Sequence, residues 1–208
     1  MPKYLTALSH SPYPTMLFPT QKPPCFKKNV NFAYTTEKVR TMQFRKVTED
    51  EADKCYEMID LVRNKMIADG RHQWTASYPS RETVENDIRQ QNAWVLDNHG
   101  HIIAYGACIV NGEPEYAHII GRWQTQQTYM VVHRLAVAVD ARGFGHGKQF
   151  LRETEKLCRA MNIHSIKVDT NYDNREMINL LSRLGYVICG QIDYGERGRR
   201  FAFEKVLA

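Results

Sequence analysis

The sequence predicts a mixed fold of helices and strands, α/β or α+β, with one sheet of six or seven strands and helices on both faces. Two observations predict this class. Apolar residues recur at the three-and-four spacing of amphipathic helices in some segments and as short β-branched runs in others. From residue 145 onward, helix and strand patterns alternate strictly. The 208 residues are 43% hydrophobic, which is enough for one core without a metal or disulfide.

The first half of the domain is expected to contain a strand, two helices and a hairpin. Thr48 and Glu51 have the spacing of a capping box, which starts the first helix. The residues Asp97-Asn98-His99-Gly100 between two apolar runs are typical of a hairpin turn. The predicted elements are a strand over 42–47, a helix from Thr48 to Gly70, a helix from Ser80, and hairpin strands over 93–96 and 101–110.

The second half is expected to start with a central strand, because the run over 129–139 is long and rich in β-branched residues. Asp173 is the expected N-cap of a later helix, and Gly185 its C′ residue. The predicted elements after the central strand are a helix over 145–161, a strand over 165–170, a helix over 174–184, and strands over 186–192 and 200–207.

The first 41 residues differ in composition from the rest of the chain. They hold six of the eight prolines, none of the twelve glycines, and six basic residues against one acidic residue. The prolines interrupt their one uncharged stretch well short of the ~20 apolar residues that a membrane span needs. We therefore expect residues 1–41 to be a flexible extension that is dispensable for function, and residues 42–208 to form one domain without a membrane partner.

Charge and cysteine usage argue against other function classes. Residues 42–208 carry 22 basic and 22 acidic residues, so this domain lacks the basic face that nucleic-acid binding requires. The five cysteines show no metal-ligand spacing, so we expect no metal site and reduced, mostly buried thiols. Reduced thiols favour a cytoplasmic location.

A glycine-rich loop, Arg-Gly-Phe-Gly-His-Gly-Lys over 142–148, joins the central strand to the next helix. Amides freed at a helix start point outward and glycines let an anion approach closely, so this loop is a candidate pyrophosphate site. A Walker loop would need glycine at position 142 and Ser or Thr at 149, which hold Arg and Gln. A dinucleotide loop would need glycine at position 148, which holds Lys.

The spacing Arg-x-x-Gly-x-Gly at Arg142, Gly145 and Gly147 resembles the acetyl-CoA pyrophosphate loop of the GNAT superfamily of N-acetyltransferases. The strand before it reads His-Arg-Leu-Ala-Val over 133–137, and the segment over 174–186 is similar to the family pattern N-x-x-A-x-x-L-Y-x-K-x-G-F. Smaller features, such as Gln73-Trp74 and Asp169-Thr170, resemble a bacterial subgroup whose substrates are mostly unassigned. The resemblance covers 42–208 and implies a mostly antiparallel sheet that splays at the central strand.

The resemblance implies acetyl-CoA as co-substrate. The loop amides would bind the pyrophosphate with Arg142 as the nearest fixed cation, the strand over 135–137 would pair with the pantetheine arm, and Asn174 would contact its amides. The implied cofactor-binding residues are Leu135, Ala136, Val137, Arg142, Gly143, Phe144, Gly145, His146, Gly147, Lys148 and Asn174.

The resemblance also implies an acyltransferase in which the amine of a small metabolite or peptide attacks the thioester directly. An alkyl amine is mostly protonated at pH 7, so a general base assists the reaction. His133 matches a position that some family members use as base, and the alternative is a structural histidine in the sheet. A backbone amide near Val137 would bind the developing oxyanion.

One position departs from the family pattern, because Leu181 stands where a tyrosine usually donates a proton to the leaving thiolate. Tyr172, Tyr186 or a water would have to replace it, or the thiolate would leave unassisted. This departure keeps a second hypothesis open, in which the domain is a catalytically silent module that binds or senses acyl-CoA.

The acceptor pocket is expected at the polar segment between the first two helices. Trp74 and Tyr78 are large aromatic residues there and would form a wall for an amine, whereas the alternative for Trp74 is a place in the core. Dimers are common in the superfamily, so a homodimer is an expectation, although the sequence itself shows no interface.

Overall fold

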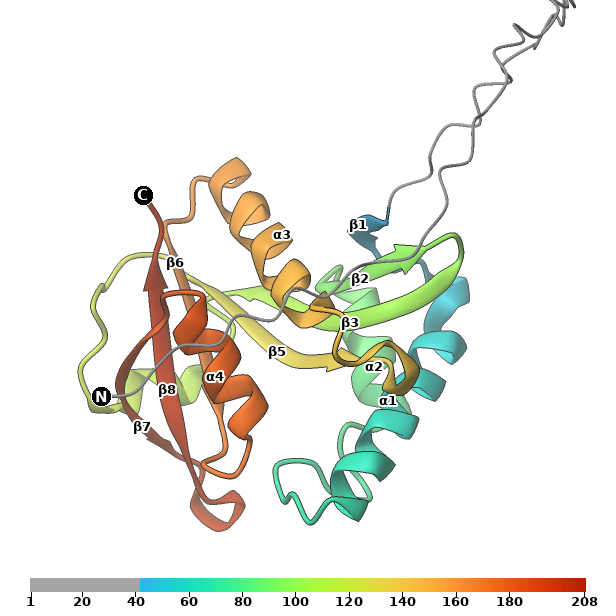
Figure 1. Cartoon of the computed structure of the whole chain (residues 1–208). Helices are drawn as coiled ribbons and strands as arrows, with labels where there is room; N and C mark the ends of the chain where they lie inside the picture. Colours follow the sequence, from blue (N-terminus) through green and yellow to red (C-terminus); the bar gives the residue numbers. More distant parts are fainter. Residues whose placement is uncertain (1–41) are drawn as a thin grey trace, which may run out of the picture. The chain divides into compact units, whose positions relative to one another are not determined.

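The structure is a computed structural model that describes residues 42–208, and the expectations for residues 1–41 lie outside this part of the chain. Figure 1 shows one sheet with helices on both faces, as the sequence predicts. The elements are β1 (Gln43–Lys46), α1 (Ala52–Ala68), α2 (Arg81–Arg89), β2 (Ala93–Asn98), β3 (His101–Val110), β4 (Ile120–Gly121), β5 (Met130–Val137), α3 (His146–Ala160), β6 (Ser165–Thr170), α4 (Arg175–Arg183), β7 (Val187–Asp193) and β8 (Arg199–Val206). Four short 3₁₀ helices accompany them: η1 (Glu49–Glu51), η2 (Pro114–His118), η3 (Val139–Ala141) and η4 (Gly195–Arg197).

Two of the three predicted helix-end residues have the predicted role, and the third prediction is wrong. The Glu51 carboxylate accepts hydrogen bonds from the Thr48 backbone amide at 3.1 Å and from its hydroxyl at 2.9 Å. Gly185 follows α4 with a φ of +82°, which favours glycine. The predicted N-cap at Asp173 is wrong, because Asn174 caps α4 by accepting a hydrogen bond from the Met177 amide at 3.3 Å.

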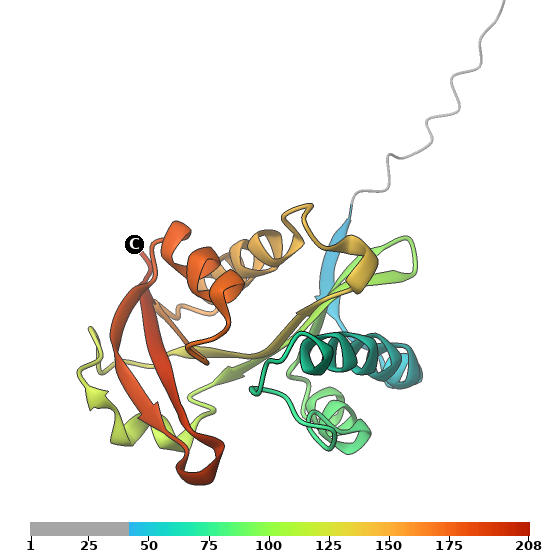
Figure 2. The same ribbon diagram turned by 60° about the horizontal axis from the view of Figure 1, so that its bottom comes forward.

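The sheet has eight strands in the order β1-β2-β3-β5-β6-β8-β7-β4. All neighbouring strands are antiparallel except β5 and β6, which run parallel. These two strands pair only at Met130 with Ile166 and at Val131 with Lys167, so they diverge beyond this point. The mostly antiparallel sheet that splays at its central strand is therefore confirmed. Figure 2 shows the β7 and β8 hairpin (red) on one side of the divergence and α1 on the other.

The extra strand is β4, which the sequence does not predict. It consists of two residues and pairs with β7 through Gly121 and Gly190. A Cβ atom at Gly121 would lie 2.4 Å from the Cys189 carbonyl oxygen, so glycine allows the two backbones to approach. A strand this short has no alternating pattern, and its only signal is the partner strand far away in the sequence.

Three groups of buried side chains hold the layers together. The face of the sheet under α3 and α4 buries residues such as Met130, Val132 and Phe150. The face under α1 and α2 buries Val95, Tyr105 and Ala136 among others. The third group packs η2 and the segment after it against the β6–β8 end of the sheet, and includes Tyr116, Trp123, Val131, Ile192, Tyr194 and Ala202. In the part of the chain that the structure describes, no helix is long and apolar enough to cross a membrane.

Candidate active site

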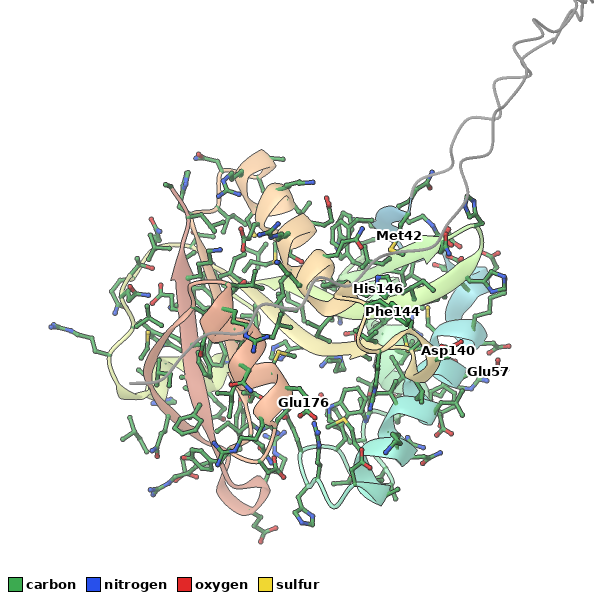
Figure 3. All side chains as sticks on the ribbon, viewed as in Figure 1. Met42, Glu57, Asp140, Phe144, His146 and Glu176 are labelled. Carbon is green, nitrogen blue, oxygen red and sulfur yellow. The ribbon has the colours of Figure 1, made fainter. Side chains whose placement is uncertain are left out.

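A cleft of about 510 Å³ opens where β5 and β6 diverge. Of the predicted cofactor-binding residues, all except Phe144 line this cleft. Phe144 is 77% exposed at the start of α3, and Figure 3 shows it beside His146. The lining residues are Val62, Met66, Arg71, Leu135, Ala136, Val137, Ala141, Arg142, Gly143, Gly145, His146, Gly147, Lys148, Asn174, Glu176, Met177 and Leu180.

The glycine loop has the backbone geometry of an anion site. Gly143 and Gly145 have φ values of +88° and +84°, which strain any residue with a side chain. Helix α3 starts at His146 without a side-chain N-cap and without an acidic residue in its first turn. The amides of this first turn and the positive end of the helix dipole therefore remain available to a negatively charged group.

Two further features of the loop fit a bound pyrophosphate. The His146 ring nitrogen Nδ1 is buried and has no hydrogen-bond partner among the described residues, so a ligand oxygen would satisfy it. A Cβ atom at Gly147 would lie 3.2 Å from Leu180 Cδ2 and 3.7 Å from Val137 Cγ2, so this glycine lets α3 pack close to α4 and β5. The residues present fit the pyrophosphate of coenzyme A.

The segment between α1 and α2 crosses to the start of α4 and borders the cleft. Arg71 Nη1 donates to Asn174 Oδ1 at 3.1 Å, and its Nη2 forms an ion pair with Glu176 at 2.5 Å. Gln73 Oε1 accepts hydrogen bonds from Thr170 Oγ1 at 3.1 Å and from the Asn171 amide at 3.2 Å. Asn174 thus lies in the cleft as predicted, but its oxygen already accepts hydrogen bonds from protein groups. The position of Arg71 in the cleft is not visible in the sequence, because its partners lie about 100 residues away.

A smaller cavity of about 50 Å³ adjoins the cleft between β5 and β6. Trp74 lines this cavity and is also buried in the α1 and α2 core, with 6% of its surface exposed. Trp74 is therefore both a core residue and part of the wall of the small cavity, so each of the two predicted roles describes part of its environment. The lining residues are Met66, Gln73, Trp74, Val132, Arg134, Leu135, Val168, Asp169, Thr170, Asn174 and Met177.

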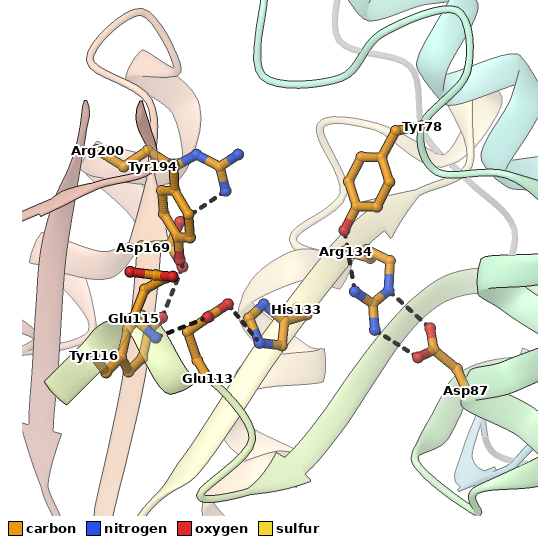
Figure 4. Close-up of polar contacts among 10 residues, drawn as sticks. All are labelled: Tyr78, Asp87, Glu113, Glu115, Tyr116, His133, Arg134, Asp169, Tyr194 and Arg200. Carbon is orange, nitrogen blue, oxygen red and sulfur yellow. Dashed lines mark hydrogen bonds and ion pairs between the residues drawn. The ribbon is translucent and has the colours of Figure 1, made fainter. Parts of the chain in front are cut away.

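A β-bulge in β5 turns two successive side chains toward the face that α2 and η2 cover. Strand β5 has one residue more than β3 between the pairs Ala136–Tyr105 and His133–Ala107, and Arg134 has a φ of +55°. As a result both His133 and Arg134 contact groups on this face (Figure 4). The sequence does not predict the bulge, because a residue in a β-branched run carries no signal for positive φ.

Arg134 fixes one side of this polar face. Its guanidinium binds the Asp87 carboxylate in a bidentate manner, at 2.8 Å from Nε and 2.5 Å from Nη2. Its Nη1 donates to the Tyr78 hydroxyl at 3.1 Å. Tyr78 is 36% exposed, so the structure places this predicted acceptor-wall residue at the surface of the polar face.

His133 lies on the same face, and its Nε2 is 3.7 Å from Oε2 of Glu113 at the start of η2. Burial and the nearby Arg134 charge lower the pKa of His133 to about 4, so its imidazole is neutral at pH 7. Burial also raises the pKa of Glu113. The sequence does not point to Glu113, because nothing near it in the chain links it to β5.

Asp169 on β6 bounds the other side of the polar face. It accepts hydrogen bonds from the Tyr116 hydroxyl at 2.7 Å, the Tyr194 hydroxyl at 3.2 Å and Arg200 Nη1 at 2.9 Å (Figure 4). Burial raises the pKa of both tyrosines, so they remain protonated donors at neutral pH. Asp169 also lines the small cavity, and it therefore connects the polar face to the cleft.

Leu181 does not face the cleft. Its side chain is fully buried in the core beneath α3 and α4, and Met177 and Leu180 line the cleft instead. Tyr172 packs edge-on against Phe201 at 4.3 Å, and Tyr186 is buried with a raised pKa. Neither tyrosine is among the described residues that line the cleft or the small cavity.

Comparisons with known proteins agree with this geometry. Residues 53–186 match the model of the acetyltransferase (GNAT) family. A structure described as an acetyltransferase of the GNAT family from Streptococcus agalactiae is 29% identical, with a TM-score of 0.73 over 81% of this chain and 97% of its own. A ribosomal-protein-alanine N-acetyltransferase from Brucella melitensis is 17% identical, with a TM-score of 0.58 over 80% of this chain and 100% of its own.

A chain from the NatC complex bound to Gag peptide and CoA is 16% identical, with a TM-score of 0.58 over 80% of this chain and 99% of its own. None of the curated proteins matches the sequence significantly. The family model covers more than half of the chain, and the splayed sheet and glycine loop are those that the motifs predict. The chain therefore belongs to the GNAT acetyltransferase family, whose fold supports acyl transfer from acyl-CoA.

Proposed function

We propose that this protein transfers the acetyl group of acetyl-CoA to a primary amine of a small metabolite or peptide by direct attack of the amine on the thioester. The observation that carries the proposal is the cleft that β5, the glycine loop, α1 and α4 line. It has a glycine loop suited to a pyrophosphate at one end, and the small cavity next to it is lined by Arg134 and Asp169 of the polar face.

The cleft residues would bind the co-substrate in an extended conformation. The first-turn amides of α3 and Arg142 would hold the pyrophosphate. Beyond Val131 the edge of β5 that faces β6 has no strand partner within residues 42–208, so the backbone at 135–137 would pair with the pantetheine amides. Acetyl-CoA supplies an activated thioester when it is bound.

The polar face would receive the amine and its proton. The amine nitrogen forms a bond to the acetyl carbonyl carbon, the carbon–sulfur bond breaks, and coenzyme A leaves as a thiolate. The proton that the amine loses passes to His133, whose neutral imidazole has the protonation state that a base requires. A backbone amide near Val137 would donate to the carbonyl oxygen as negative charge develops.

The size of the small cavity supports an acetyl group as the transferred acyl group. The cavity of about 50 Å³ is far smaller than the cleft, and the bulky side chains of Met66, Trp74 and Met177 line it, so it favours a short acyl group. We therefore expect acetyl-CoA to be a better donor than acyl-CoA molecules with longer chains.

A catalytically silent acyl-CoA-binding module is the second candidate function. The observation that favours it is Leu181, which is buried in the core where the family usually has a tyrosine that donates a proton. A thiolate with a pKa near ~8.5 can leave without a donor, so this departure does not preclude turnover.

The test is release of free coenzyme A from acetyl-CoA by the full chain, with amino acids, polyamines and short peptides as acceptors and mass spectrometry of the products. An acetylated amine that forms with the protein and not without it is the result that the proposal predicts. Acetyl-CoA binding without acetylation of any of these amines would contradict it and support the silent module.

A further inference from the structure

We propose that Glu113 is a positioning residue for acyl transfer, which holds the His133 imidazole with its Nε2–H toward the Glu113 carboxylate and leaves Nδ1 to take the proton of the amine. This inference rests on the proposed function, in which His133 is the base. It adds a residue from outside the family motifs and assigns it a defined task.

The geometry that supports the proposal is an ion-pair contact between two mostly buried side chains. His133 Nε2 lies 3.7 Å from Glu113 Oε2, and the two side chains are 15% and 17% exposed. Glu113 is the N-cap of η2, and its Oε1 accepts a hydrogen bond from the Glu115 amide at 3.2 Å. One carboxylate oxygen is therefore fixed by the backbone, and the other faces the imidazole.

The segment that carries Glu113 is anchored to the sheet. The Tyr116 hydroxyl donates to Asp169, and the Trp123 indole donates to the Tyr116 carbonyl at 2.8 Å. The Lys167 ammonium lies between the rings of Trp123 and Tyr129, 4.4 and 3.9 Å from their centroids. These contacts hold η2 against β6, so the position of Glu113 relative to β5 is set by the fold.

The charges around the pair leave Glu113 available to the imidazole. Arg134 is paired with Asp87, and Arg200 is paired with Asp169. Glu113 is the carboxylate of this polar face that has no arginine partner among the described residues, and its ion-pair contact is the histidine. Its negative charge would therefore stabilise an imidazolium that forms beside it.

Other charged groups face the imidazole as well, and any pH dependence must include them. Burial and the two arginines lower the pKa of His133, whereas the carboxylates of α2 and β6 raise it. The charged groups that shift the pKa of His133 are Arg134 on its own strand, Asp87 on α2, Asp169 on β6 and Arg200 on β8. Glu113 at η2 lies 3.7 Å from its Nε2. A base in this environment is weak, so a carboxylate in contact with the imidazole has a large effect on its ability to accept a proton.

One proton passes from the amine to His133 and then to solvent. The amine proton moves to His133 Nδ1 as the carbon–nitrogen bond forms, and the Nε2–H proton stays on the ring and points toward the Glu113 carboxylate. After the products leave, the imidazolium returns its proton to solvent. No further reactant is needed.

Two substitutions at one position separate charge from shape. Glu113→Gln keeps the size and a hydrogen-bonding oxygen but removes the charge, whereas Glu113→Asp keeps the charge. With the best acceptor amine, Glu113→Gln should lower kcat by at least about tenfold, within the ~10²–10⁴-fold that a general base contributes. Glu113→Asp should retain more activity than Glu113→Gln, and the KM for acetyl-CoA should stay unchanged in both. Glu115→Gln on the same 3₁₀ helix is the matched control, because its backbone amide rather than its carboxylate contacts Glu113.

A double variant tests whether Glu113 acts through His133. If it does, Glu113→Gln should cause no further loss of kcat when His133→Gln is already present. Multiplicative losses in the double variant would overturn the proposal, as would equal activity of Glu113→Gln and Glu115→Gln.

Nitrogen NMR of the full chain tests the pair without any acceptor, so its result is separate from the test of acyl transfer. At pH 7 the neutral imidazole of His133 should carry its proton on Nε2. The measurement is made at pH 7, because burial raises the pKa of Glu113 and its carboxylate loses its charge as the pH approaches 4. A proton on Nδ1 at pH 7 would overturn the proposal even if an amine is acetylated.

Discussion

At the scale of single residues, His133 links the candidate site to the stability of the protein. Its pKa is about 4 in the folded chain and ~6.5 in an unfolded chain. Between these values the unfolded chain binds more protons, so His133 makes the free energy of unfolding fall as the pH drops from 6.5 to 4. The integrated effect is about 3 kcal/mol, because one pKa unit corresponds to ~1.4 kcal/mol.

We predict that His133→Gln removes this part of the pH dependence. Urea unfolding of the variant should show a smaller loss of stability between pH 7 and pH 4.5 than the wild type, and the exposed His164→Gln should behave like the wild type. Glu113 is present in all three proteins, so its own titration does not distinguish them. Equal slopes for wild type and His133→Gln would show that His133 is not buried in its neutral form.

Leu181 gives a second prediction at this scale. Its side chain is fully buried in the core beneath α3 and α4, whereas the neighbouring Leu180 lines the cleft. A tyrosine at 181 adds a ring and a hydroxyl to a filled core, so Leu181→Tyr should destabilise the protein by about 1–3 kcal/mol. Leu180→Tyr should cost less, because the cleft has room. Thermal unfolding of both variants checks the order, and a stable Leu181→Tyr would contradict the packing described for α4.

At the scale of elements, the segment between β3 and β5 depends on one buried carboxylate. Glu204 on β8 is fully buried and accepts hydrogen bonds from the Gln124 amide and the hydroxyls of Thr125 and Ser165, at 2.5, 2.5 and 2.7 Å. Its charge also acts on the buried Lys167, whose pKa burial lowers. The carboxylate therefore anchors the segment that presents Glu113 to the site.

Glu204→Gln should destabilise the protein by about 2–4 kcal/mol, because it weakens charged hydrogen bonds and leaves Lys167 without its countercharge. The comparison is Glu153→Gln, which removes a surface ion pair with Lys156 and should change stability by less than ~1 kcal/mol. Urea unfolding at pH 7 gives both values. A loss at Glu204 no larger than at Glu153 would contradict the anchoring role.

Local signals explain which elements are predictable from the sequence. The capping box at Thr48, the helix end at Gly185 and the glycine loop depend on residues close together in the chain, and each has the predicted place. The features that are not predicted depend on partners far away in the sequence. Strand β4 exists because Gly121 meets Gly190, and the β5 bulge is visible only in its register with β3.

At the scale of the whole domain, the active-site geometry results from the limited pairing of β5 and β6. Because these strands pair at two positions only, the sheet opens a cleft that reaches from the glycine loop on α3 toward the polar face under η2. The glycine-loop end of the cleft is predictable from the sequence, because most of its residues are consecutive. The polar face is not, because the partners in pairs such as Asp87 with Arg134 lie 47 positions apart.

The cleft and the polar face, as far as the structure describes them, are built from residues within 42–208, so we expect this domain to bind acetyl-CoA without residues 1–41. We predict the same dissociation constant for acetyl-CoA, measured by calorimetry, with the full chain and with 42–208. Binding that is lost on removal of residues 1–41 would show that they complete the site.

The central claim is that the glycine loop binds acetyl-CoA, and thermal unfolding with and without this ligand tests it most directly. Gly145→Glu places a negative charge where the pyrophosphate would bind, and Gly100→Glu is the control, because Gly100 has the same positive φ in the β2–β3 turn. Ligand at about 100 times its Kd should stabilise the wild type by ~2.7 kcal/mol, or roughly 5–11 °C. This shift should appear in the wild type and in Gly100→Glu and should be lost in Gly145→Glu. No shift in the wild type at about millimolar ligand, or an unchanged shift in Gly145→Glu, would contradict it.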